Sequence, residues 1–176
     1  MEDDLVKQRL KKLDELKKLG VNPYSYIFDK KDDSIKLLDE FKELKKDEKG
    51  KRKVSVAGRV VTLREMGKAS FGHIQDEGGK IQFYIKEEEV GEKAYKILKL
   101  TDIGDIIGIK GFVFKTKTGE ITVRTESYEL LTKGIRPLPE KWHGLKDVEI
   151  RYRKRYLDLI ANPEVREIFR KRSEII

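Results

Sequence analysis

Residues 67–85 read GKASFGHIQDEGGKIQFYI, and this stretch decides the fold class. Apolar and polar residues alternate on both sides of DEGGK, which is the pattern of two half-buried strands joined by a tight turn. Two residues in this stretch raise a question: Phe71 lies in a polar, glycine-flanked run, and Gln82 lies between apolar residues. Neither side chain is obviously needed to build a core, so both are candidates for a role outside it.

The strand pattern begins before this hairpin and continues after it. Val54, Val56 and Val60 alternate in a first strand, and GDIIGIKGFVFKTKTGEITV reads as two further strands joined at Gly119, which can adopt a positive φ. A short helical stretch, about residues 91–100, separates the third strand from the fourth. Strand–strand–strand–helix–strand–strand is the element order of the OB-fold, a five-stranded barrel that commonly binds oligonucleotides. An SH3-like or other small barrel is the alternative.

Helical patterns flank the predicted barrel. Residues 3–19 are expected to form an amphipathic helix, and a second one begins with Ser34 as its N-cap and is followed by a charged linker, KKDEKGKRK, at residues 45–53. Beyond residue 131 a proline-containing, extended connector leads to a helix that begins at Pro163, with Asn162 as its N-cap. We therefore expect a mainly β protein with flanking helices: N-terminal helices in residues 1–50, the barrel in 51–132, a linker in 133–162 and the start of a further helix in 163–176.

The composition is that of a charged protein with a modest core. Of the 176 residues, 41% are charged and 38% are hydrophobic, and the net charge is +8. An excess of basic over acidic residues is typical of proteins that bind a polyanion such as nucleic acid. The alternative is a surface rich in ion pairs, as in a heat-adapted protein. No apolar run approaches the roughly 18 residues of a membrane helix, so we expect a cytoplasmic protein. The absence of cysteine excludes disulfides and thiolate zinc sites, and two isolated histidines make a poor metal site.

No motif of a catalytic site is present. The sequence lacks a phosphate-binding GxxxxGK[ST] loop, HExxH, GxSxG and a dinucleotide-binding GxGxxG. His73 and His143 are 70 residues apart, and for a lone strand histidine a surface or packing role is the expectation. We therefore expect this chain to bind a ligand and not to catalyse a reaction by itself.

A binding role is favoured by Phe71 and Gln82. The pleat of adjacent strands can bring both side chains to the outer face of the barrel. There the ring could stack on an unpaired base, worth about 1 to 3 kcal/mol, and the amide could donate and accept hydrogen bonds at a base edge. A Phe71 ring that simply belongs to the core is the alternative.

Charged residues near the predicted loops could extend such a site. Arg64 lies at the end of the first strand and Glu120 lies beside the turn between the last two, where each could reach a ligand. Lys68, Lys115 and Lys117 could hold phosphates, with an affinity that falls as the salt concentration rises. For all five residues the alternative is an ordinary charged side chain that is exposed to solvent and contacts no ligand.

Four segments carry a more specific signal. They are GRVVTLREMGKASFGHIQDEGGKIQFYI, GDIIGIKGFVFKTKTGEITV, ELLTKGIRPLPEKWHGLKD and RYRKRYLDLIANPEVREIFRKRSEII, in this order along the chain. Together they resemble the N-terminal part of class II lysyl-tRNA synthetase. MGKASF and RPLPEKWHGL separate this resemblance from the aspartate and asparagine enzymes, which have a similar barrel.

The resemblance implies an OB-fold anticodon-binding domain that grips the anticodon loop of the lysine tRNA and reads its uridines, above all the middle one. It implies that Phe71 stacks on that base, that Gln82 and Arg64 bond its edge, and that Glu120 contacts a neighbouring base. The full-length enzyme would be a homodimer that ligates lysine to tRNA with ATP and Mg²⁺. Its catalytic domain is expected after Ile176, so this piece is expected to have no cofactor and only to bind.

Two other interpretations remain open. The chain could be a free-standing module that binds single-stranded nucleic acid through the same barrel, without a ligase. It could also be an interaction protein whose N-terminal helices pair with a protein partner.

Overall fold

The computed structural model describes residues 2–139, 145 and 147–176. By its contacts the chain divides into two compact units, residues 1–137 and residues 138–176. The first unit contains the predicted barrel and the helices before it, and the described residues of the second include three helices. Trp142 and His143, which belong to the segment expected to be an extended connector, lie outside the described residues.

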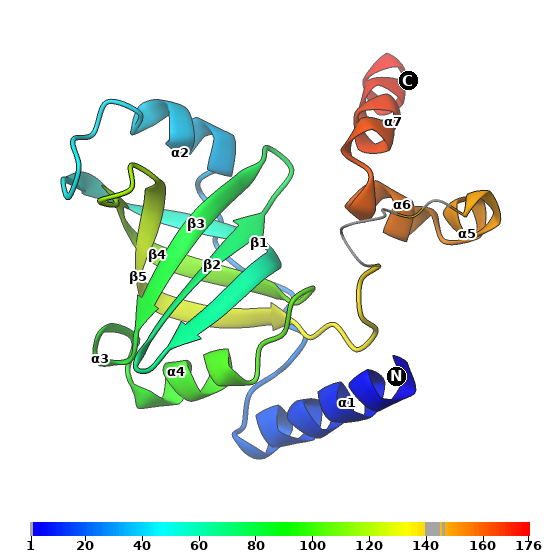
Figure 1. The fold of residues 1–176 in the computed structure, drawn as a ribbon, viewed down its shortest axis with the longest axis horizontal. Coiled ribbons are helices and arrows are strands. Elements are labelled where there is room, and N and C mark those ends of the chain that lie inside the picture. The colour runs from blue at the N-terminus through cyan, green and yellow to red at the C-terminus, as the bar shows by residue number, and fades with distance from the viewer. Residues whose placement is uncertain (1, 140–144, 146) are drawn as a thin grey trace. The chain divides into compact units, whose positions relative to one another are not determined.

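Five strands close into a barrel, as Figure 1 shows. They are β1 (Lys49–Met66), β2 (Ala69–Gln75), β3 (Lys80–Lys86), β4 (Ile106–Lys115) and β5 (Ile121–Thr132). The hydrogen-bonded order is β1-β2-β3-β5-β4, and β4 pairs again with β1. Only the pair β3 and β5 is parallel, and α3 (Glu87–Val90), α4 (Glu92–Lys99) and β4 supply the crossover that a parallel pair needs. The predicted OB-fold is confirmed.

The barrel interior is built from alternate residues of each strand. Along β2 and β3 every second side chain is buried, and the residues between face outward. Phe83 lies at the centre of this core, and a β carbon at Gly72 would come within 2.4 Å of its ring. Glycine is therefore required there for β2 to pack over the ring. Tyr95 and Leu98 of α4 are buried in the same core.

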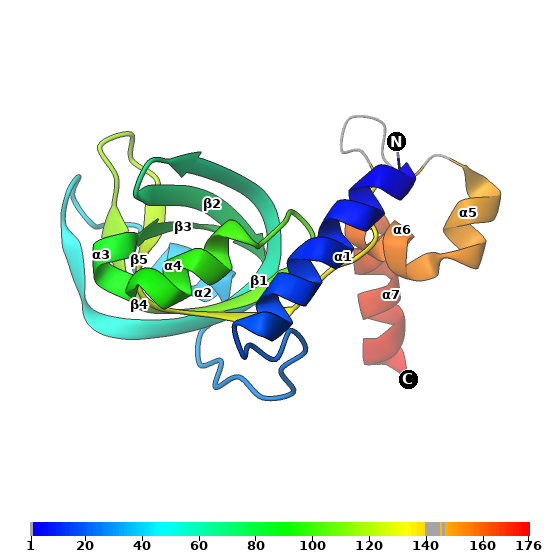
Figure 2. The same ribbon diagram turned by 90° about the horizontal axis from the view of Figure 1, so that it is seen from below.

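Helix α1 (Glu2–Lys18) lies against the chain that leaves β5, as the views in Figures 1 and 2 both show. Leu16 is fully buried, and the Arg9 guanidinium donates to three backbone carbonyls, those of Ile103, Gly134 and Arg136. Lys12 pairs with Asp102 at 2.6 Å, and Asp102 also accepts a bond from the buried Lys133. Burial and these charge-assisted bonds attach α1 to the barrel unit.

Two expectations at the start of the barrel are wrong. The N-cap of α2 (Ser34–Glu40) is Asp33, and Ser34 is the first helical residue. Its backbone N–H and hydroxyl both donate to Asp76, which lies between β2 and β3, so a tertiary contact replaces the predicted local cap. Strand β1 begins at Lys49, inside the segment expected to be a charged linker, because its first residues pair with β4.

The second unit contains α5 (Val148–Arg153), α6 (Arg155–Ala161) and α7 (Pro163–Ile175). The prediction of an extended connector before Pro163 is therefore wrong over α5 and α6, where the chain is helical. The Asp147 side chain caps α5, and the buried Asp158 carboxylate accepts bonds from Arg151, Arg155 and Asn162. Burial opposes the charged form of Asp158, but the bonds from Asn162 and Arg151 prevail and lower its pKa.

The predicted N-cap Asn162 and first residue Pro163 of α7 are confirmed. None of the described helices is long and apolar enough to cross a membrane.

Candidate nucleic-acid interface

Two neighbouring rows of paired residues cross the outer face of β1, β2, β3 and β5. The polar row consists of Thr62, His73, Gln82 and Thr122, each paired with the next in the sheet register. The aromatic row consists of Arg64, Phe71, Tyr84 and Arg124, paired in the same way. Within each strand the members of the two rows are two residues apart, so both rows project from the same face of the sheet.

Phe71 belongs to this outer face and not to the core. Its side chain is partly exposed, whereas its neighbours Ser70 and Gly72 are buried. The ring stacks on Tyr84, with 4.4 Å between centroids and 28° between planes, and Tyr84 in turn tilts against Phe114 at 6.3 Å. One face of the Phe71 ring is thus covered by a second aromatic residue, which holds the ring in a defined orientation.

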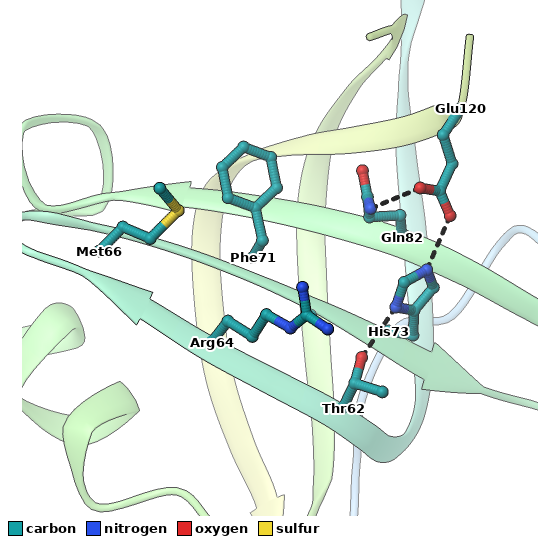
Figure 3. Close-up of a pocket in the computed structure, with 8 residues that line it drawn as sticks. Thr62, Arg64, Met66, Phe71, His73, Gln82 and Glu120 are labelled. Atoms are coloured by element: carbon teal, nitrogen blue, oxygen red, sulfur yellow. Dashed lines mark hydrogen bonds and ion pairs between the residues drawn. The ribbon is translucent and has the colours of Figure 1, made fainter. Parts of the chain in front are cut away.

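Four side chains of the interface form a continuous hydrogen-bonded network, seen in Figure 3. Thr62 Oγ1 lies 2.8 Å from His73 Nδ1, and His73 Nε2 lies 2.7 Å from Glu120 Oε1. Gln82 Nε2 donates to the other oxygen of Glu120 at 2.6 Å. Thr122 extends the network by donating to Gln82 Oε1 at 2.6 Å. Glu120, directly before β5, thus joins the side chains of two other strands.

These residues line a hollow of about 340 Å³. Its walls are formed by Thr62, Arg64, Met66, Phe71, Gly72, His73, Gln82 and Glu120. Arg64 and Met66 are exposed, and the Arg64 guanidinium forms no hydrogen bond or ion pair with any residue that the structure describes. Figure 3 shows this guanidinium extending between Phe71 and His73. A ring, a cation and an amide around one hollow can stack on an unpaired base and bond its edge.

The predicted site residues fall into two groups. Phe71, Gln82, Arg64 and Glu120, predicted from distant parts of the sequence, all line the hollow. The predicted phosphate contacts, Lys68, Lys115 and Lys117, are not among its lining residues. Lys115 Nζ donates to the backbone carbonyl of Lys42 at 2.8 Å. Lys68 and Lys117 are exposed in the turns that follow β1 and β4.

Sequence reasoning missed three residues of the interface: His73, Thr62 and Tyr84. His73 was expected to have a surface or packing role, yet it bonds Thr62 and Glu120 at the edge of the hollow. The signal in the sequence was the spacing of two from Phe71 to His73 and from Gln82 to Tyr84, which places each pair on one face of its strand. Which neighbours these side chains meet depends on the register between strands, and no single strand specifies it.

Comparison with known proteins agrees with this architecture. Residues 54–131 match the family described as OB-fold nucleic acid binding domain, tRNA_anti-codon. The chain is 54% identical over 174 residues to a lysine–tRNA ligase of Carboxydothermus hydrogenoformans, 51% identical over 174 residues to one of Pelotomaculum thermopropionicum, and 46% identical over 176 residues to one of Bacillus subtilis.

Each of these alignments covers 99% of this chain but only 33 to 35% of the relative, so the chain spans about a third of the length of these enzymes. The matched family and the closed five-stranded barrel cover the same segment, and the chain aligns with its relatives over nearly all of its length. Residues 54–131 are therefore similar to the OB-fold nucleic acid binding domains, and the chain as a whole is similar to the N-terminal region of lysine–tRNA ligases.

Proposed function

We propose that this chain is the anticodon-binding part of a lysine–tRNA ligase. Its barrel grips the anticodon loop of the lysine tRNA and reads the uridines, above all the middle one. The observation that carries the proposal is the outward-facing hollow, where an aromatic ring, an amide and a cation meet on a barrel of the matched nucleic-acid-binding family. Single-stranded RNA is recognised by such surfaces, through stacking of splayed bases and hydrogen bonds to their edges.

The role of each residue is proposed from the resemblance to lysine–tRNA ligases, and it is compatible with the geometry of the hollow. The free face of the Phe71 ring stacks on the middle base, and Gln82 and Arg64 bond its edge. Glu120, whose two oxygens already accept bonds from His73 and Gln82, contacts a neighbouring base with its remaining lone pairs. Lys68 and Lys117 interact with phosphates from the exposed turns, and Lys115, which donates one of its three N–H groups to the carbonyl of Lys42, does so with the others.

The activity of the whole enzyme is part of the same proposal. The relatives are named for the ligation of lysine to tRNA, and we propose that the full-length protein does this in the cytoplasm as a homodimer, with ATP and Mg²⁺. Among the described residues, no group of three or more His, Asp or Glu side chains is placed to hold a metal ion. No residue of this chain is therefore assigned to Mg²⁺, and the chain by itself is proposed to bind tRNA without catalysis.

Fluorescence anisotropy with labelled anticodon stem-loops tests the proposal. The chain should bind a stem-loop with a middle U more tightly than the same stem-loop with a middle C. Phe71→Ala should weaken binding about 5- to 150-fold, the equivalent of about 1 to 3 kcal/mol of stacking. Tyr26→Ala is the matched control, because Tyr26 is 92% exposed and does not line the hollow.

Two results would contradict the proposal. Equal binding of both stem-loops would favour a general single-strand-binding module, and unchanged binding by Phe71→Ala would remove the stacking role.

A further inference from the structure

We propose that His73 is the positioning residue that lets this site distinguish uracil from cytosine, by fixing which way round the Gln82 amide faces. The inference deepens the proposed function and rests on it. His73 itself is not assigned a contact with the base. It acts through Glu120, which in turn orients Gln82.

A glutamine amide by itself does not distinguish the two pyrimidines. Its oxygen accepts hydrogen bonds, its nitrogen donates them, and the two ends have nearly the same size. Uracil presents a donor at N3 and an acceptor at O4, whereas cytosine presents an acceptor at N3 and a donor at N4. An amide that pairs with uracil pairs equally well with cytosine after a half-turn about its terminal bond. Discrimination therefore requires that the half-turn be prevented.

Glu120 prevents it in this structure. The Gln82 nitrogen donates to Glu120 Oε2 at 2.6 Å, and an ionised carboxylate can only accept hydrogen bonds. Turning the amide over would place its oxygen against that carboxylate, with no hydrogen between them. The Thr122 hydroxyl, which donates to the amide oxygen at 2.6 Å, can either donate or accept and therefore adapts to both orientations. Glu120 is thus the group that makes the two orientations unequal.

His73 holds Glu120 in place. The Glu120 side chain is 45% exposed at the end of a turn, and an exposed carboxylate of this kind exchanges between rotamers unless something binds it. His73 Nε2 lies 2.7 Å from Glu120 Oε1, and because the carboxylate only accepts, Nε2 carries the proton. His73 Nδ1 lies 2.8 Å from the Thr62 hydroxyl, from which it accepts when the ring is neutral, and this second contact fixes the ring. Thr62, His73 and Gln82 are successive members of the polar row, so the sheet register keeps them adjacent.

The test measures the ratio of dissociation constants for middle-C and middle-U stem-loops. For His73→Ala we expect this ratio to fall about tenfold, by analogy with the discrimination that one bidentate base contact provides. Part of the fall should come from tighter binding of the middle-C stem-loop than wild type shows. A general loss of structure cannot produce that gain. Glu120→Gln should lower the ratio in the same way, because a neutral amide accepts either orientation of Gln82.

Two further variants complete the design. His73→Gln should restore most of the ratio, because its amide can donate to Glu120 and accept from Thr62. Ser127→Ala is the matched control: Ser127 is an exposed residue of β5 that does not line the hollow, so the ratio should not change. Thermal unfolding followed by circular dichroism establishes that each variant is folded. If His73→Ala does not fold, His73→Leu, which keeps a bulky side chain but cannot bond Glu120, takes its place.

The failure of this inference can be told apart from the failure of the proposed function. If His73→Ala and Glu120→Gln weaken both stem-loops equally, His73 supports the structure only, and the inference is wrong while anticodon binding stands. If the wild-type chain shows no preference for U, the proposed function itself is wrong.

Discussion

At the scale of single residues, the interface depends on side chains that hold others in place. The Phe71 ring is partly exposed, and Tyr84 holds it by stacking on it with 4.4 Å between centroids. Gln82 presents a defined donor and acceptor because Glu120 and Thr122 bind its two ends. In both cases the supporting group already restricts the conformations of the side chain before a ligand binds. Binding then costs less conformational entropy, and this preorganisation increases the affinity.

Tyr84→Ala should therefore weaken RNA binding although Tyr84 does not line the hollow. An aromatic pair contributes about 0.5 to 1.5 kcal/mol, so we expect an affinity about 2- to 13-fold lower. The preference for U over C should not change, because the polar row is intact. Anisotropy titrations with both stem-loops measure both quantities. Tyr84→Phe, which keeps the ring, should bind like wild type, and a Tyr84→Ala variant with wild-type affinity would show that Phe71 needs no support.

At the scale of elements, a turn between strands organises the start of a helix. The Asp76 carboxylate, between β2 and β3, accepts from the backbone N–H groups of Gly78 and Gly79 at 3.0 Å and from Ser34 at the start of α2. Burial opposes the charged form of Asp76, but the bonds from Ser34 and Gly79 and the charge of Lys30 prevail, and its pKa lies below the ordinary 3.8. One carboxylate thus closes the hairpin and attaches α2 to it.

The lowered pKa predicts the direction of a pH dependence. An Asp whose pKa is lower in the folded than in the unfolded chain stabilises the fold fully above the unfolded value, and this contribution is lost as the pH falls below it. The free energy of unfolding should therefore decrease as the pH falls below about 3.8. Asp76→Asn should be less stable at pH 7 and should lose less stability in that acid range. Urea titrations at several pH values measure this, and an acid dependence in Asp76→Asn equal to that of wild type would contradict it.

At the scale of the whole molecule, charge determines how the interface meets a polyanion. The chain carries a net charge of +8, but many of its cations are already paired, as Lys12 is with Asp102 and Arg124 is with Glu89. Lys68 and Lys117 project from turns near the ends of β1 and β4, and their side chains form no ion pair within the described part of the chain. Both can therefore displace counterions from RNA phosphates.

Replacing both lysines should lower affinity without altering base preference. Each phosphate contact on a single strand contributes about 0.7 to the slope of log affinity against log salt, so Lys68→Ala with Lys117→Ala should reduce the slope by about 1.4. Affinities at several salt concentrations give the slope. Lys36→Ala is the control, since Lys36 is equally exposed but paired with Asp33 at 2.8 Å. An unchanged slope in the double variant would show that Lys68 and Lys117 do not contact the RNA phosphates.

Much of this architecture was accessible from the sequence. Alternation of apolar residues identified the strands on both sides of DEGGK, and the position of one helix between the third and fourth strands identified the barrel. The same alternation made Phe71 and Gln82 candidates, because it indicates that neither side chain is needed to build the core. The start of β1, the cap of α2 and the helices α5 and α6 were not predicted correctly. Each depends on a partner distant in sequence or on a local charge network such as that of Asp158, and local propensity does not encode these.

The sequence by itself determined the five-stranded barrel and the strands that carry Arg64, Phe71 and Gln82, because apolar periodicity and turn chemistry act over a few residues. Only the tertiary structure decided that Phe71 faces outward against Tyr84, and that His73, Glu120 and Gln82 form one network. The physical reason is the register between strands. Pairing across a sheet brings together side chains from four segments of the chain, and a shift of one residue would turn each of them to the opposite face.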